Sequence, residues 1–148
     1  MSNYTTDADI LAQEPSIKDY GIIDFTDYHS KTTADVQRHL RIEWWPRVRR
    51  HSSLTFTTTD LEMNTAKLTA SQFKNAAVYH CLSYYILPKL TQHTAEPDRF
   101  RMMIDFYKAR FREEFDYVLQ DGVKYDWDGD GTVSEAEEQP QHFNRLVR

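Results

Sequence analysis

Six residues with oxygen ligands recur at fixed spacing within a twelve-residue stretch near the end of this sequence. They fall at positions 1, 3, 5, 7, 9 and 12 of that stretch and are Asp126, Asp128, Asp130, Thr132, Ser134 and Glu137. Gly131 occupies position 6, where a tight loop needs positive φ. Ca²⁺ takes about six to eight oxygen ligands, and alternating side chains of such a loop can face one centre. The sequence therefore predicts a calcium site, with Thr132 offering its carbonyl, Ser134 acting through water and Glu137 binding through both oxygens.

The spacing is typical of an EF-hand loop, but its surroundings are not those of a regulatory one. A sensor needs a helix on each side of the loop and works as one of a pair. This chain has no second loop, Gly122 interrupts the incoming helix, and Gln139-Pro140 stops the outgoing helix after about one turn. We therefore expect a structural calcium ion that fixes a turn. A small single-EF-hand protein that engages a protein target is the alternative.

The elements that must position this loop are helical. The 148 residues include only four glycines and five prolines, which favours one all-α domain over a sandwich or barrel. Thr69-Ala-Ser-Gln72 has the pattern of a capping box, followed by a helical apolar stripe to about Leu90. Asp98 is expected to cap a second stripe, which ends before Gly122. These two long helices predict an antiparallel hairpin at the core.

The rest of the chain is expected to be simpler. Residues 1–31 show no helical period and are predicted to be an irregular arm. Thr32 or Thr33 is expected to cap a shorter helix that Pro46 ends or kinks, with residues 55–59 as a strand-like link. The predicted organisation is thus an arm at 1–31, a helical core at 32–125, the calcium loop at 126–137 and an extended tail at 138–148.

A basic cluster surrounds Trp44-Trp45. Its members are Arg38, Arg41, Arg47, Arg49, Arg50 and His51. They are candidates for contact with phosphate or with an acidic partner. Contact with phosphate would suit a non-specific nucleic-acid-binding module. The alternative is a solvated basic face whose tryptophans pack inward. Charge is segregated along the chain although the net value is only −5.

Several classes of protein are not indicated. Cys81 is the only cysteine, so the chain forms no internal disulfide, and no apolar run approaches the roughly 20 residues that cross a bilayer. The polar, acidic N-terminus does not read as a signal peptide, so we expect a soluble protein made in the cytoplasm. The histidines lack metal-ligand spacing, and no catalytic constellation is visible. The sequence predicts a protein that is not an enzyme.

Residues 54–148 resemble the head-to-tail connector (adaptor) proteins of tailed bacteriophages. The likeness rests on the segment Leu68–Ala77, on the aromatic-rich helix ending Phe111-Arg-Glu-Glu-Phe-Asp116, and on the aspartate loop with its short polar tail. Such proteins do not require a complete calcium loop, so the role of calcium here is inferred from the loop chemistry alone.

The resemblance implies a small helical virion subunit in the neck of the particle, assembled in the host cytoplasm into a homo-oligomeric, typically dodecameric, ring. The ring would join the portal protein to tail and neck proteins and line part of the DNA channel. It further implies that the C-terminal segment reaches the portal; the matching residues are Phe143, Leu146, Val147 and Arg148.

Overall fold

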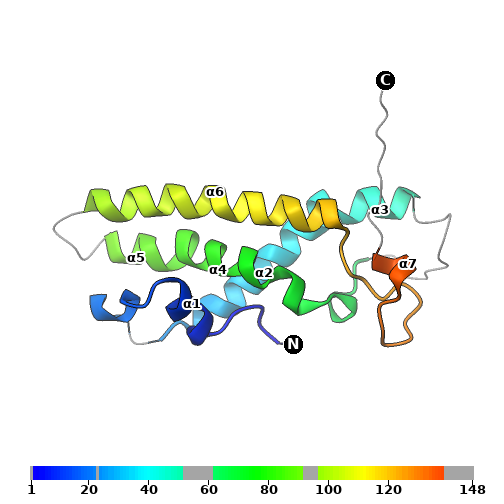
Figure 1. Ribbon diagram of the computed structural model, residues 1–148, viewed down its shortest axis with the longest axis horizontal. Helices are drawn as coiled ribbons and strands as arrows, with labels where there is room; N and C mark the ends of the chain where they lie inside the picture. Colours follow the sequence, from blue (N-terminus) through cyan, green and yellow to red (C-terminus); the bar gives the residue numbers. More distant parts are fainter. Residues whose placement is uncertain (1, 23, 52–61, 92–96, 139–148) are drawn as a thin grey trace, which may run out of the picture.

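The computed structural model describes residues 2–22, 24–51, 62–91 and 97–138, and within these it is all-α. The predicted fold class is confirmed in this respect. The described residues contain no strand, only one isolated antiparallel bridge between Leu68 and Tyr125. Figure 1 shows an elongated arrangement in which the longest helix, α6 (Pro97–Asp121), runs along one edge. No helix of the described segments has both the length and the apolar character needed to cross a membrane.

The second long helical segment runs beside α6 in the opposite direction (Figure 1). It consists of α4 (Lys74–Cys81), a π-helical turn η5 (Leu82–Ile86) and α5 (Leu87–Thr91). The predicted stripe of α6 ran from Met103 or Ile104 to Val118 or Leu119. Its middle members Tyr107, Phe111, Phe115 and Val118 are buried, whereas Met103, Ile104 and Leu119 are only partly buried. The facing stripe is buried as predicted except at Tyr84, which is 45% exposed. A π turn holds one more residue than an α turn, so it shifts the side chains that follow around the helix.

Helix α2 (Thr26–Glu43) begins six or seven residues before the cap predicted at Thr32 or Thr33. Both threonines lie buried inside the helix, so the predicted cap is wrong. The Thr33 hydroxyl oxygen accepts a hydrogen bond from the backbone N–H of Tyr4 at 2.9 Å, which gives it a tertiary role instead. The helix ends at Glu43 with Trp44 as its C-cap, and α3 (Trp45–His51) follows with Pro46 in its first turn, where proline is tolerated.

The N-terminal segment is not the irregular arm that was predicted for residues 1–31. It forms α1 (Asp7–Gln13), capped reciprocally by Thr6 and Asp9, and a 3₁₀ turn η1 (Ile17–Tyr20). Its apolar side chains, Ile10 and Ile17, are buried against the other helices. Short helices like these carry little periodicity and are held by tertiary contacts, which a sequence pattern does not reveal. One such contact is the ion pair between Asp9 and Lys74 of α4, at 2.8 Å.

The helix starts at Thr69 and Asp98 also differ from prediction. Two 3₁₀ turns, η3 (Thr65–Lys67) and η4 (Ala70–Phe73), precede α4, and the Thr69 side chain makes no capping bond. Proline at the first position starts α6, and Asp98 lies in its first turn, near the positive end of the helix dipole. The strand-like link at 55–59 lies outside the described residues.

Candidate metal centre

The segment that leads into the aspartate loop is fixed to the body of the protein. Helix α6 ends at Asp121, and Gly122 turns the chain with φ 98°, a conformation that suits glycine. The side-chain amide of Gln72 then donates to the Gly122 carbonyl at 2.8 Å, and its oxygen accepts from the Lys124 N–H at 2.9 Å. The Thr69 N–H also donates to the Lys124 carbonyl at 3.2 Å. The loop entrance is therefore tied to the turns that precede α4.

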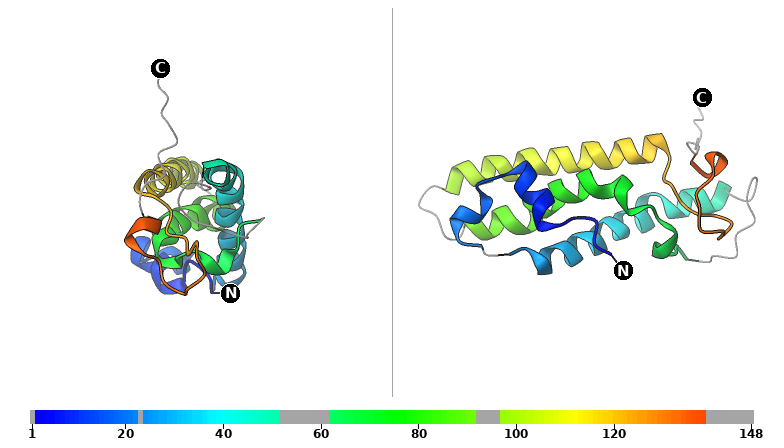
Figure 2. Two further views of the ribbon diagram at one scale, coloured as in Figure 1. Left: turned by 90° about the vertical axis from the view of Figure 1, so that its right-hand side faces the viewer. Right: turned by 60° about the horizontal axis from the view of Figure 1, so that its bottom comes forward.

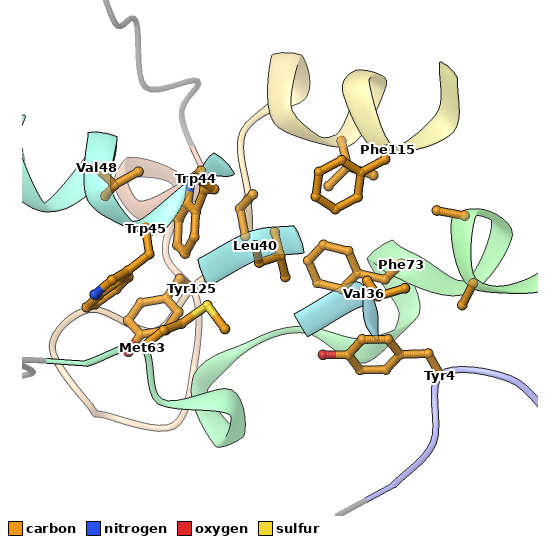
Figure 3. Close-up of a cluster of buried hydrophobic side chains, with 14 of the residues drawn as sticks. Tyr4, Val36, Leu40, Trp44, Trp45, Val48, Met63, Phe73, Phe115 and Tyr125 are labelled. Carbon is orange, nitrogen blue, oxygen red and sulfur yellow. The ribbon is translucent and has the colours of Figure 1, made fainter. Parts of the chain in front are cut away.

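The residues on either side of Asp126 anchor the loop in the core. Tyr125 and Trp127 are 0% and 1% exposed. The Trp127 ring stacks on Trp45 with centroids 5.7 Å apart and rings 7° from parallel, and it lies 4.7 Å from Tyr125. Figure 3 shows Tyr125 beside Trp44, Trp45 and Met63. Because alternate residues of this segment point into the core, Asp126 between them is turned toward the loop.

Three carboxylates converge in the loop. Asp126, Asp128 and Asp130 each offer an oxygen, and these oxygens all lie within 4.8 Å of one another. Asp126 is almost buried and orders the loop backbone, because its oxygens accept from the N–H groups of Gly129, Asp130 and Gly131 at 2.9 to 3.2 Å. The three aspartates predicted as ligands are therefore brought together.

Glu137 closes the loop but is not a member of that three-residue group. It lies in the four-residue helix α7 (Glu135–Glu138) and is 1% exposed. One oxygen accepts from the N–H groups of Trp127 and Asp128 at 2.7 and 3.2 Å. The other accepts from the N–H and the hydroxyl of Ser134 at 2.7 and 2.9 Å. Glu137 thus ties the end of the loop to its start, a structural role beside the predicted bidentate one.

The loop carboxylates repel one another, and this repulsion changes their pKa values. A hydrogen bond from the Asp130 N–H lowers the pKa of Asp128, but desolvation and the neighbouring acids Asp126, Asp130 and Glu137 outweigh it, so the pKa is raised overall. Burial would raise the pKa of Glu137, yet its hydrogen bonds from Ser134, Asp128 and Trp127 lower it below the ordinary value. A cation at the centre would relieve the crowding at Asp128.

Thr132 and Ser134 support the acids through their hydroxyl groups. The Thr132 N–H and hydroxyl donate to Asp130 at 2.8 and 2.9 Å, which lowers the pKa of Asp130. Ser134 donates to Glu137 as described above. The donor set consists of carboxylates, hydroxyls and backbone carbonyls, all oxygens, and this is the set that Ca²⁺ and other hard cations prefer.

The other predicted site residues are only partly placed. Arg38, Arg41 and Arg47 are exposed on α2 and α3, while Trp44 and Trp45 are buried, so the tryptophans do pack inward. The Arg38 guanidinium is exposed and lies 3.6 Å from the half-buried Asp35, so this ion pair has little energetic weight. The side chains of Arg49 and Arg50, and the whole tail with Phe143, Leu146, Val147 and Arg148, lie outside the described residues.

Two residues that position the loop were not identified from the sequence. Gln72 was interpreted as part of a capping box, yet its amide holds the loop entrance. Lys67 places its ammonium group 6.0 Å from the Tyr125 ring centroid and close to Gly129 of the loop. No local pattern marks either role, because both contacts join segments about fifty or more residues apart in the chain.

A second group of polar side chains lines a pocket of about 360 Å³ between α2 and the π turn. Asp35 accepts a hydrogen bond from the Tyr85 hydroxyl and lies 3.8 Å from His80 Nε2. His80 is 3% exposed, and burial lowers its pKa to about 4 despite the attraction of Asp35, with His39 acting in the same direction as burial. His80 is therefore neutral at pH 7.

Comparison with known proteins returns no match, whether to protein-family models, to curated proteins or to solved structures.

Proposed function

We propose that this chain is a non-enzymatic structural protein whose loop Asp126–Glu137 binds one Ca²⁺ as a fixed clip. The observation that carries the proposal is the convergence of Asp126, Asp128 and Asp130 on a backbone already tied to the core. Calcium would neutralise the crowded acids and hold α7 against the loop entrance. In this proposal the EF-hand-type loop lies at one end of the domain, after the hairpin that α4 and α5 form with α6.

A clip fits this arrangement better than a sensor. A sensor moves one helix against another when calcium binds. Here Trp127 is packed between Trp45 and Tyr125, and the described part of the outgoing helix has only four residues. A calcium-dependent opening would have to pull Trp127 out of the core. Apolar dye binding that is unchanged by calcium is expected, and a calcium-induced rise would favour the single-EF-hand target-binding alternative.

The calcium proposal is tested by titration with Tb³⁺ and Ca²⁺. Terbium luminescence sensitised by Trp127 is expected, and Ca²⁺ should quench it by competition. Asp128→Asn removes one exposed ligand charge and should weaken binding about tenfold or more, whereas Glu135→Gln, an exposed loop acid outside the predicted ligand set, should leave the affinity within about twofold. Absence of a terbium signal together with no calcium by elemental analysis would defeat the assignment.

We further propose that the protein is the ring-forming connector between portal and tail in a tailed phage. The proposal rests on the resemblance of residues 54–148, and its site would be the virion neck. The ring would contact portal and neck proteins and lie close to the DNA, with Phe143, Leu146, Val147 and Arg148 as the portal contacts. The exposed Arg38, Arg41 and Arg47 would face phosphate or an acidic partner.

Electron microscopy of the purified protein, alone and with the portal, tests the connector role. Rings, or binding of the chain to portal assemblies, are expected. Removal of residues 143–148 should abolish portal binding while leaving the unfolding temperature unchanged. A protein that forms no ring and ignores the portal would refute this role without touching the calcium proposal.

A further inference from the structure

The pocket of about 360 Å³ between α2 and the π turn is built around the buried side chain of His80. Figure 2 shows the segment that contains the π turn lying between α2 and α6. The His80 ring stacks on Tyr84 with centroids 4.3 Å apart, and its centroid lies 5.9 Å from that of Tyr85. In a regular α-helix the residue four positions on lies over His80 but the fifth does not, so the π turn brings both tyrosines to one histidine.

His80 makes no side-chain hydrogen bond to the described part of the chain, although it is only 3% exposed. Its Nδ1 is buried without a partner, and its Nε2 faces the Asp35 carboxylate at 3.8 Å, too far for a direct hydrogen bond. Buried polar groups are almost always hydrogen-bonded. At this separation one atom can lie about 2.8 Å from both Nε2 and the Asp35 oxygen. The gap between these two side chains is therefore the place for a ligand atom.

Asp35 supplies a negative charge that the chain itself matches only weakly. Its side chain is 21% exposed and accepts a hydrogen bond from the Tyr85 hydroxyl. The Arg38 guanidinium is its ion-pair partner at 3.6 Å, but that group is 68% exposed, and such a pair is weak. Burial keeps His80 neutral at pH 7, so it does not repel a second cation beside Asp35. A cation from outside can therefore replace Arg38 at the carboxylate.

The surroundings suit an ammonium group in particular. The rings of Tyr84 and Tyr85 line the pocket, and aromatic faces attract cations. The Lys108 ammonium already lies 5.0 Å from the Tyr84 ring centroid, although Lys108 does not itself line the pocket. The Tyr85 hydroxyl donates its proton to Asp35, so its oxygen, like the carboxylate, is left as an acceptor. An ammonium has three N–H donors and no acceptor, and it therefore matches this set of acceptors and rings.

We propose that this pocket binds a primary ammonium group, which donates hydrogen bonds to the Asp35 carboxylate and to Nε2 of His80. A volume of about 360 Å³ lies in the range of small-ligand sites. The body of the ligand can extend past Tyr84 and Tyr85 into the neighbouring pocket of about 480 Å³, because these two tyrosines line both pockets. The inference goes beyond the proposed calcium and connector functions and depends on neither of them.

An NMR titration of the ¹⁵N-labelled full chain with n-butylammonium, at pH 7 and constant ionic strength, measures the binding. Saturable shifts of the backbone amides of Tyr84 and Tyr85 are expected, with a dissociation constant on the order of 1 mM for so small a ligand. Butan-1-ol and butyrate have the same carbon chain without the positive charge, and tetramethylammonium has the charge without an N–H; all three should bind more weakly. Absence of saturable shifts with butylammonium, or equal binding of butan-1-ol or tetramethylammonium, overturns the proposal.

Two substitutions with opposite expected effects separate this site from a general loss of structure. Asp35→Asn keeps the shape of the side chain and removes its charge, so it should weaken butylammonium binding about tenfold or more. Arg38→Gln removes the competing guanidinium and should tighten binding about threefold. Asp121→Asn changes an exposed acid at the end of α6 that lines neither pocket, and it should bind as the wild type does. Binding that Asp35→Asn leaves unchanged, or that Arg38→Gln weakens, contradicts the assignment.

The same ammonium group can belong to a free amine or to a lysine side chain of a partner, and a second titration distinguishes these sources. Nα-acetyl-lysinamide carries butylammonium on a peptide backbone. Binding at least as tight as that of butylammonium identifies a lysine side chain as the ligand, whereas clearly weaker binding identifies a free amine. In either case His80→Phe, which keeps a ring against Tyr84 and removes both nitrogens, should weaken butylammonium binding about fivefold. Unchanged binding by His80→Phe would show that His80 is not an acceptor and would refute the proposed site.

Discussion

Replacing Gln72 should loosen the loop entrance and lower the stability of the whole domain. Its amide makes two hydrogen bonds, to the Gly122 carbonyl and from the Lys124 N–H, at 2.8 and 2.9 Å. Each such bond contributes about 1 kcal/mol net, so Gln72→Ala should cost about 2 kcal/mol of unfolding free energy. For a chain of this length that is roughly 4–8 °C in the melting temperature.

The measurement is thermal and urea unfolding in excess chelator, so that metal binding does not contribute. Gln72→Met keeps a side chain of similar length and removes both hydrogen bonds, and it should lose nearly as much as Gln72→Ala. Ser71→Ala changes the exposed neighbouring residue and should stay within about 0.5 kcal/mol of the wild type. If Gln72→Met unfolds like the wild type, the two hydrogen bonds do not hold the loop and the reasoning is refuted.

Three further outcomes are expected. Gly131 has φ 92° with open space around it, so Gly131→Ala should cost only backbone strain, about 1–2 kcal/mol, and should weaken calcium binding roughly tenfold. Calorimetric titration measures the affinity, with Glu135→Gln, outside the predicted ligand set, as the control. The pKa of His80 is near 6.5 in the unfolded chain and about 4 in the folded protein, so folding requires the neutral ring. The free energy of unfolding is therefore unaffected by His80 above pH 6.5, and up to about 3 kcal/mol of it is lost as the pH falls toward 4. His80→Gln should flatten this part of the curve of stability against pH. Burial raises the pKa of Cys81 to about 12, so its thiol should react with a disulfide reagent only after denaturant is added, and rapid reaction of the native protein would contradict its burial.

The features that the sequence predicted well are those with a local or periodic signature. The stripe from Tyr107 to Val118 follows from helix geometry, and the structure buries it. The spacing of the three aspartates follows from loop geometry, and the structure brings their carboxylates together, while the metal itself stays a prediction. The end of α6 at Gly122 is likewise a property of glycine.

The features that were missed depend on contacts distant in the chain. Helix α1 is short and is held by Asp9 with Lys74 and by Glu14 with Tyr107, so its own pattern gave no sign of it. Thr33 was predicted to cap a helix because threonine favours that position, but it lies inside α2 and its hydroxyl accepts a hydrogen bond from the Tyr4 N–H. Glu137 also accepts hydrogen bonds from the start of the loop. The sequence did not predict this second role, because a metal ligand and a hydrogen-bond acceptor are the same carboxylate.

The burial of Trp127 has a consequence for synthesis of the protein. The wall of the aromatic cluster comes from Trp44 and Trp45, which leave the ribosome early, whereas Tyr125 and Trp127 emerge only after α6 is complete. Until then the two early tryptophans lack the rings that bury them, and the nascent chain exposes an apolar surface to solvent. Release of residues 122–127 is therefore the step that seals this end of the domain, and a chain truncated before it should be a chaperone substrate.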